Sequence, residues 1–274
     1  MLLARRFQDA VAALLVLVSL ASTASANPIR VGVTEYVYQD LTEQIGGKLV
    51  KVTLLHNPTS ASQLPPLDLV ICSRSSGDTH LRNAIQQLPT RPFAIEVSSS
   101  ARFPWYDVQA MTDLSQRIAT ELKRRAPADG LRIAANVRST LTAFHTFDRR
   151  IEEIAKVYAK SDILLGDTLY EGTVDRLRFK IRDQGYLKSF RPGASPPAKS
   201  IASLKEAIQR REGGIFIYDK DAAGSAIAKL ADLANNNGVP VVALHEQPPR
   251  GVHYQQWMLR QLNAVHGALN EASQ

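Results

Sequence analysis

The 274-residue sequence has almost no cysteine and no hydrophobic run long enough to cross a membrane. Cys72 is the only cysteine, so no intramolecular disulfide can form and the fold depends on its hydrophobic core. The longest apolar run, Ala10 to Leu20, is shorter than the roughly 20 residues that a membrane helix needs. Aromatic residues make up only 7% of the chain, so a cluster of them is informative.

The apolar run belongs to a sequence pattern typical of a secretory signal peptide. Arg5 and Arg6 precede it, and a small-residue motif ending at Ala26 follows it. We therefore expect cleavage after Ala26 and a soluble, exported mature chain that begins at Asn27.

The sequence also lacks the signatures of several functional classes. The net charge is +7, and it becomes +6 when residues 1–26, with two arginines and one aspartate, are removed. No basic stripe is interleaved with aromatic residues, so we expect no nucleic-acid partner. No nucleophile elbow, zinc-protease helix or phosphate-binding glycine loop is present, so we expect neither an enzyme nor a catalytic cofactor.

Two stretches of alternating strands and helices flank a long helical middle. Apolar strands are predicted at 29–33, 50–55, 67–72 and 93–97, and again at 162–165, 214–218 and 239–244. No proline or glycine interrupts the helical spacing from Leu131 to about Lys160. The sequence predicts an α/β protein of two lobes, each a parallel sheet flanked by helices, joined by one long rigid helix. The predicted boundaries are 27–129, 130–160 and 161–274.

The stretch "ARFPWYDVQAM" (101–111) gathers aromatic side chains at the head of a helix. Because ligands of such sheets bind at the carboxyl ends of strands, Phe103, Trp105 and Tyr106 are predicted to line a cleft between the lobes. The alternative is that these aromatic side chains simply pack at the lobe interface.

The order of four segments resembles the zinc- and manganese-type solute-binding proteins of ABC importers, the cluster A-I or cluster 9 family. These segments are "VGVTEYVYQDLTEQIGGKLVKVTLL", "PWYDVQAMTDLSQRIATEL", "SPPAKSIASLKEAIQRREGGIFIY" and "YQQWMLRQLNAVHGAL". The resemblance implies a monomeric periplasmic protein that holds its ligand between two lobes. It also implies zinc or manganese as cargo and an ABC permease in the inner membrane as partner.

The histidines that the family uses as metal ligands are largely missing. The resemblance implies one histidine from each of three segments, with a carboxylate or another histidine from the second lobe. In this sequence the first histidine position falls near Ala61 or Ser62, and Phe103 stands at the second. Gly166, followed by Asp167, stands at the third. Since Zn²⁺ wants about four N or O ligands, a metal site here would have to be rearranged.

The remaining polar residues at the predicted cleft define the candidate site. The predicted metal ligands are His245, Asp167, Asp219 and His56, and the predicted ligand-cleft residues are Phe103, Trp105, Tyr106, Tyr218 and Glu246. Asp167 and Asp219 could instead cap or precede helices, and His245 could be an ordinary loop residue. Three functions stay open: delivery of a cation, delivery of an organic or chelated-metal ligand, and an accessory, partner-binding role without a small ligand.

Overall fold

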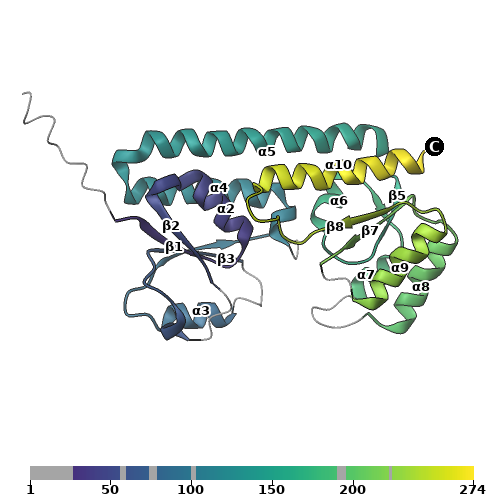
Figure 1. Cartoon of the computed structure of the whole chain (residues 1–274), viewed down its shortest axis with the longest axis horizontal. Helices are drawn as coiled ribbons and strands as arrows, with labels where there is room; N and C mark the ends of the chain where they lie inside the picture. The colour runs from purple at the N-terminus through teal and green to yellow at the C-terminus, as the bar shows by residue number, and fades with distance from the viewer. Residues whose placement is uncertain (1–26, 56–59, 74–78, 100–102, 190–195, 222–223) are drawn as a thin grey trace, which may run out of the picture.

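The computed structural model describes residues 27–55, 60–73, 79–99, 103–189, 196–221 and 224–274. They form two α/β lobes that lie side by side, with one long helix running across both (Figure 1). The predicted fold class is therefore confirmed. No helix in these ranges combines the length and the hydropathy of a membrane span.

The first lobe is built on a four-stranded parallel sheet. Its strands lie in the order β2-β1-β3-β4. Their bounds are β1 Ile29–Val33, β2 Val50–Leu54, β3 Leu69–Ser73 and β4 Phe93–Val97. Helices α2 (Tyr36–Gly46), α3 (Thr79–Gln86) and α4 (Val108–Arg125) complete the lobe, with the short 3₁₀ helices η1 (Gly47–Leu49), η2 (Ala61–Gln63), η4 (Pro104–Tyr106) and η5 (Pro127–Asp129).

The second lobe repeats this strand arrangement. Its parallel sheet has the order β6-β5-β7-β8, with bounds β5 Asp162–Leu165, β6 Lys180–Ile181, β7 Ile215–Asp219 and β8 Val241–Leu244. Its helices are α6 (Glu171–Leu177), α7 (Gln184–Ser189), α8 (Ala198–Gln209) and α9 (Ser225–Asn236). The two-residue edge strand β6 was not predicted, because it is too short to give a period of its own.

Two long helices connect the lobes. Helix α5 (Gly130–Tyr158) has 29 residues and spans about 43 Å at 1.5 Å per residue. It packs on α2 and α4 of the first lobe and on α6 of the second. The C-terminal helix α10 (Tyr254–Ala272) runs beside α5 (Figure 1). A single buried apolar cluster therefore continues through both lobes, whereas a smaller one lies under α3 on the other face of the first sheet.

The first lobe also anchors the start of α10. His253 precedes this helix without capping it through its own side chain. Asp40 of α2 supplies the missing acceptor: its Oδ2 accepts the Tyr254 N–H at 2.7 Å, and its Oδ1 lies 2.7 Å from His253 Nδ1. A carboxylate here satisfies a first-turn N–H and interacts favourably with the positive end of the helix.

We expect Asp40→Ala to lower the free energy of unfolding by about 1–2 kcal/mol, the usual cost of losing a helix cap. Urea denaturation of the variant would measure this loss. Asp113→Ala is the matched control, because Asp113 is exposed and accepts only an i,i+4 bond from Gln109. Equal losses in the two variants would contradict the capping role.

Candidate functional site

The candidate site lies at the junction of the lobes, beyond the carboxyl ends of the strands. From the first lobe comes η4, which follows β4 and leads into α4. Asp107 caps the N-terminus of α4, because its Oδ1 accepts the N–H groups of Gln109 and Ala110 at 3.1 and 3.3 Å. From the second lobe come the segments after β5, β7 and β8. The local sequence thus presents η4 to the opposite lobe on a firmly capped helix.

Trp105 and Tyr106 cross the junction and bind the backbone of the second lobe. Trp105 Nε1 donates to the Glu246 carbonyl at 2.7 Å, and the Tyr106 hydroxyl donates to the His245 carbonyl at 2.6 Å. Their exposed fractions are only 3% and 1%. In return, Thr173 Oγ1 of α6 donates to the Tyr106 carbonyl at 3.1 Å. We call these contacts the aromatic clasp.

Helix α10 completes the clasp. The Gln261 amide accepts the His245 N–H at 3.1 Å and donates to the His245 carbonyl at 3.0 Å. It also donates to the Tyr106 hydroxyl. The Tyr254 hydroxyl donates to the Trp105 carbonyl at 2.6 Å. Sequence reasoning missed both α10 residues, because Tyr254 reads only as a core position of a helix and Gln261 is a single polar residue with no motif around it.

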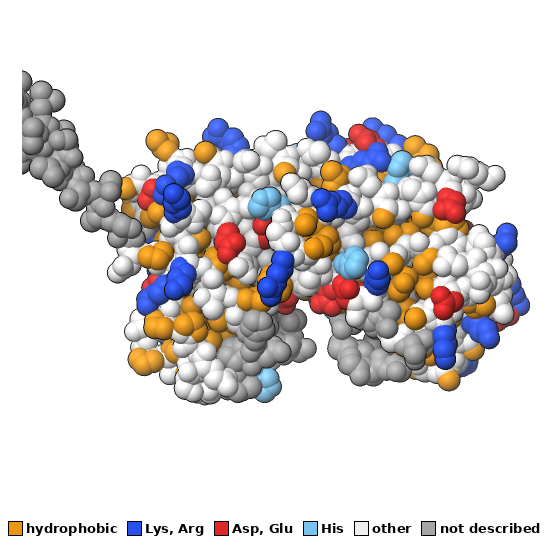
Figure 2. Space-filling view, viewed as in Figure 1, with side chains coloured by type: hydrophobic (Ala, Val, Ile, Leu, Met, Phe, Trp, Pro, Cys, Tyr) orange, Lys and Arg blue, Asp and Glu red, His pale blue; other side chains and the backbone are white. Residues whose placement is uncertain are grey.

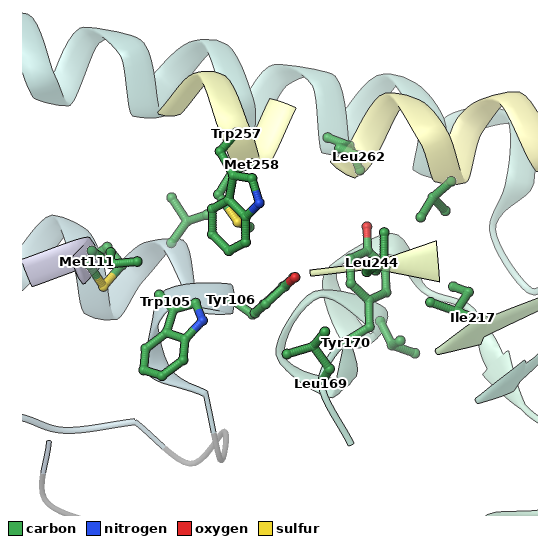
Figure 3. Close-up of a cluster of buried hydrophobic side chains, with 14 of the residues drawn as sticks. Trp105, Tyr106, Met111, Leu169, Tyr170, Ile217, Leu244, Trp257, Met258 and Leu262 are labelled. Carbon is green, nitrogen blue, oxygen red and sulfur yellow. The ribbon is translucent and has the colours of Figure 1, made fainter. Parts of the chain in front are cut away.

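Aromatic rings fill the space around the clasp. Tyr106 contacts Tyr170 and Trp257 edge-to-face, with centroid distances of 5.8 and 5.6 Å. Phe103 is half-buried, and its ring contacts that of Trp105 edge-to-face, with a centroid distance of 5.5 Å. Figure 3 shows Trp105, Tyr106 and Trp257 between the ribbons of the two lobes and α10. These rings pack against one another, which is the alternative left open for Trp105 and Tyr106.

Burial at the junction changes the acid–base behaviour of Tyr106. Its pKa lies well above the ordinary value of 10.0. Burial is the main cause, followed by the neighbouring Tyr170, Asp219 and Asp167. Burial likewise raises the pKa of Tyr254. The clasp therefore depends on neutral phenols, which can donate a hydrogen bond.

The two acidic residues of the predicted metal set are buried and bonded to backbone groups. Asp167 follows β5, and its Oδ1 accepts the Leu169 N–H at 2.8 Å. Its Oδ2 accepts the N–H of Asp219 at the end of β7. Asp219 Oδ1 accepts the Asp221 N–H at 2.9 Å. Exposed fractions of 7% and 2% for Asp167 and Asp219 show that both carboxylates support the turns after their strands from inside the protein.

His245 and Glu246 are tied to Asp221. His245 Nδ1 lies 3.1 and 3.2 Å from the two Asp221 oxygens, and the Glu246 N–H donates to Asp221 Oδ2 at 3.1 Å. The side chains of His245 and Asp221 are 44% and 48% exposed. Asp221 was not among the predicted site residues, although it lies two positions after Asp219. The ring of Tyr218, another predicted cleft residue, stacks on the ring of Phe216, with centroids 6.0 Å apart.

Gly166, which the resemblance places at a family histidine, has no room for a larger side chain. A Cβ added at Gly166 would lie 2.9 Å from both Phe216 Cζ and Tyr218 Cβ, closer than real Cβ atoms come. Across the described ranges, no three His, Cys, Asp or Glu residues are grouped so that they could hold a metal ion. His56 lies outside the described residues, so the predicted ligand set remains a prediction.

Comparisons with known proteins point to one family. The family model described as ZnuA, the periplasmic component A of the zinc-uptake complex, matches residues 103–268. No curated protein matches the sequence.

Solved structures share the fold at low sequence identity. The periplasmic zinc-binding protein TroA from Treponema pallidum aligns with a TM-score of 0.72 and 14% identity, over 89% of this chain and 99% of that one. The laminin-binding protein Lbp of Streptococcus pyogenes aligns with a TM-score of 0.71 and 17% identity, over 88% of this chain and 99% of that one. The solute-binding protein FpvC from Pseudomonas aeruginosa, in complex with Mn²⁺, aligns with a TM-score of 0.68 and 15% identity, over 89% of this chain and 99% of that one.

We expect Tyr106→Phe to lower the free energy of unfolding by about 1–3 kcal/mol, since it removes a buried donor and leaves the Gln261 amide without its phenol partner. Hydrogen exchange of the amides at 245–247 should accelerate as well. Tyr36→Phe is the control, because the Tyr36 hydroxyl only accepts a bond from the exposed Arg250. A loss as small as that of the control, within about 0.5 kcal/mol, would argue against the clasp.

Stability should fall as the pH rises above about 10. The pKa values of Tyr106, Tyr170, Tyr186 and Tyr254 are raised by burial, so the unfolded chain releases these protons first. The stability that these neutral phenols contribute is fully present below the pKa that tyrosine has in the unfolded chain. It is lost as the pH rises toward the pKa values of the same phenols in the folded chain. Urea denaturation at several pH values in this range measures how the free energy of unfolding falls with pH. The fall should be smaller in Tyr106→Phe than in the unchanged protein, by about 1.4 kcal/mol per pH unit. Identical slopes would mean that Tyr106 ionises normally in the folded chain.

Proposed function

Because the chain belongs to the family of periplasmic zinc-uptake components, we propose that it serves a metal-type ABC importer without holding a free cation between its lobes. In this proposal the permease binds a protein whose lobes are already joined. The supporting observation is the aromatic clasp: Trp105 and Tyr106 are buried and donate to the carbonyls of Glu246 and His245. An accessory, partner-binding role fits this arrangement better than closure around an ion.

The surroundings of the clasp support the same proposal. The Asp167 carboxylate already accepts two backbone N–H groups, and Gly166 leaves no space for an imidazole. Zn²⁺ and Mn²⁺ need several converging ligands, and removing a buried carboxylate from its N–H partners would cost about 1–3 kcal/mol for each bond. TroA and FpvC are described as binding zinc and Mn²⁺ respectively. For this chain we propose that the free ion is not the ligand at this junction.

The test is thermal unfolding of the metal-stripped chain with Zn²⁺, Mn²⁺ or Ni²⁺. An ion at 100 times its Kd would stabilise the protein by about 2.7 kcal/mol, or roughly 5–10 °C at this size. We expect no such shift. A shift of that size that disappears in His245→Ala would overturn the proposal and establish a rebuilt metal site.

A second candidate, an organic or chelated-metal ligand, is favoured by one pocket. It has a volume of about 690 Å³ and lies between α2, the end of β2 and the segment 248–253. At its edge the Arg250 guanidinium carbon lies 5.8 Å from the Tyr36 ring centroid, and Arg250 Nη2 donates to the Tyr36 hydroxyl at 3.1 Å. Such an arginine suits the carboxylates of a chelate. Zinc citrate in the same unfolding assay would support this candidate by a shift that Arg250→Ala abolishes.

A further inference from the structure

Strand β2 forms one edge of the first sheet, and this edge lines the pocket beside Arg250. Because the strand order is β2-β1-β3-β4, β2 pairs only with β1. Every residue of β3 is buried, whereas no residue of β2 is. The pocket, with a volume of about 690 Å³, is lined by Val52, Thr53 and Leu54 of this edge. We call it the edge groove.

The backbone of β2 presents unpaired N–H and C=O groups to the edge groove. Successive residues of a strand point these groups alternately toward and away from the neighbouring strand. The Leu55 N–H donates to the Val33 carbonyl at 2.7 Å, so Thr53 and Leu55 face β1. Val52 and Leu54 therefore face outward, and within the described residues neither has a backbone partner on that side. A row of free backbone groups at strand spacing is matched by another extended chain.

The walls of the edge groove carry opposite charges at its two ends. Helix α2 connects two parallel strands and so runs antiparallel to them, which places Tyr36 toward Leu54 and Glu43 toward the start of β2. At the Tyr36 end lies Arg250. Arg250 and Glu43 are exposed, and neither has an ion-pair partner within the described ranges. In Figure 2, acidic, basic and histidine side chains lie over α2 and the start of α10 on the face turned to the viewer.

The separation of these charges fits a strand of five residues. Tyr36 and Glu43 are seven residues apart on α2, or about 10 Å at 1.5 Å per residue. Five strand residues cover about 13 Å, and the first, third and fifth share one face. The side chains of Val52 and Leu54 pack toward α2, so the residues that lie beside them in an added strand would meet the α2 wall. A basic first residue would meet Glu43, and an acidic fifth residue would meet Arg250.

We propose that the edge groove binds an extended segment of a partner protein as a fifth strand of the first sheet, parallel to β2. Its basic residue pairs with Glu43, and an acidic residue four positions later pairs with Arg250. The backbone bonds provide attachment, and the two charges fix direction and register. This inference rests on the partner-binding role proposed above and names its surface. The groove does not include the clasp, so the metal-ion test and the test below can fail independently.

Nuclear magnetic resonance of the isotope-labelled chain with a test peptide measures strand addition. The peptide is acetyl-Lys-Thr-Val-Thr-Glu, which places β-favouring residues between the two charges. At about 5 mM peptide, a concentration suited to a weak ligand, amide exchange at Val52 and Leu54 should slow at least about fivefold, because an added strand covers both N–H groups. The Leu55 amide already bonds to β1 and should change less than about twofold.

Modified peptides separate strand pairing from charge attraction. In the proposed register both threonine N–H groups face β2, and the valine N–H faces away from it. N-methylation of the second threonine should therefore abolish the protection, whereas N-methylation of the valine should leave it within about twofold. The reversed peptide, acetyl-Glu-Thr-Val-Thr-Lys, places like charges together at both ends and should bind at least about fivefold more weakly.

A matched pair of proline variants tests the protein side. Val52→Pro removes one outward N–H of β2, and proline is tolerated on edge strands; we expect the protection of Leu54 to disappear. Ala94→Pro is the control, because Ala94 is exposed on β4, the opposite edge of the same sheet, and its N–H also faces outward. Its binding of the peptide should stay within about twofold of the unchanged protein. Circular dichroism and the Tm of both variants verify that each is folded.

Several results would overturn the proposal. They are no protection by the unmodified peptide, equal protection by the two N-methylated peptides, and unchanged protection of Leu54 in Val52→Pro. Binding that Arg250→Gln abolishes and Val52→Pro leaves intact would also overturn it, because a small anion held by Arg250 does not need the strand edge. The N-methylated peptides decide the question even if Val52→Pro does not fold.

Discussion

The relative position of the two lobes depends on hydrogen bonds that buried aromatic side chains of the first lobe donate to backbone carbonyls of the second. Trp105 and Tyr106 each fill apolar space with a ring and satisfy one carbonyl with the polar tip of that ring. A carbonyl buried without a donor would cost about 1–3 kcal/mol, so the bonds and the ring packing stabilise the same arrangement. Gln261 and Tyr254 of α10 hold the other ends of this network, which makes the C-terminal helix part of the junction.

The carboxylates behind the clasp have a structural role of the same kind. Asp167 accepts one N–H from its own turn and one from the end of the neighbouring strand β7, so it joins two strand ends. In a junction of low polarity these charge-assisted bonds are stronger than they would be in water, and they compensate the cost of burying the charge. Tyr106 is near enough for Asp167 and Asp219 to raise its pKa further. The raised pKa of Tyr106 keeps its phenol neutral, so that the hydroxyl can donate to the His245 carbonyl.

The sequence was sufficient to predict the lobes and the long helix, because their signals are periodic. Uninterrupted apolar strands, and a helical pattern from 131 to about 160 without proline or glycine, determine the α/β class. Lack of room at Gly166 could not be foreseen, because Phe216 approaches from a strand fifty residues later. Gln261 was missed for a similar reason: a single polar residue in a helix gives no sign of the distant backbone that it binds. Phe103, Trp105 and Tyr106 were noticed as a group, yet only their burial shows that two of them pack across the lobes.

The clasp and the two long helices together limit how far the lobes can separate. Helices α5 and α10 lie side by side across both lobes, so any wide opening would have to bend both of them. It would also break the Trp105 and Tyr106 bonds and release Thr173 from the Tyr106 carbonyl. At about 0.5–1.5 kcal/mol for each bond, before any apolar surface is exposed, three bonds amount to roughly 1.5–4.5 kcal/mol. An equilibrium of that size leaves the open form at about 7% at the lower limit and below about 0.1% at the upper limit. A permease that requires separated lobes would therefore have to supply this free energy itself, whereas one that recognises the joined form would find almost every molecule ready to bind.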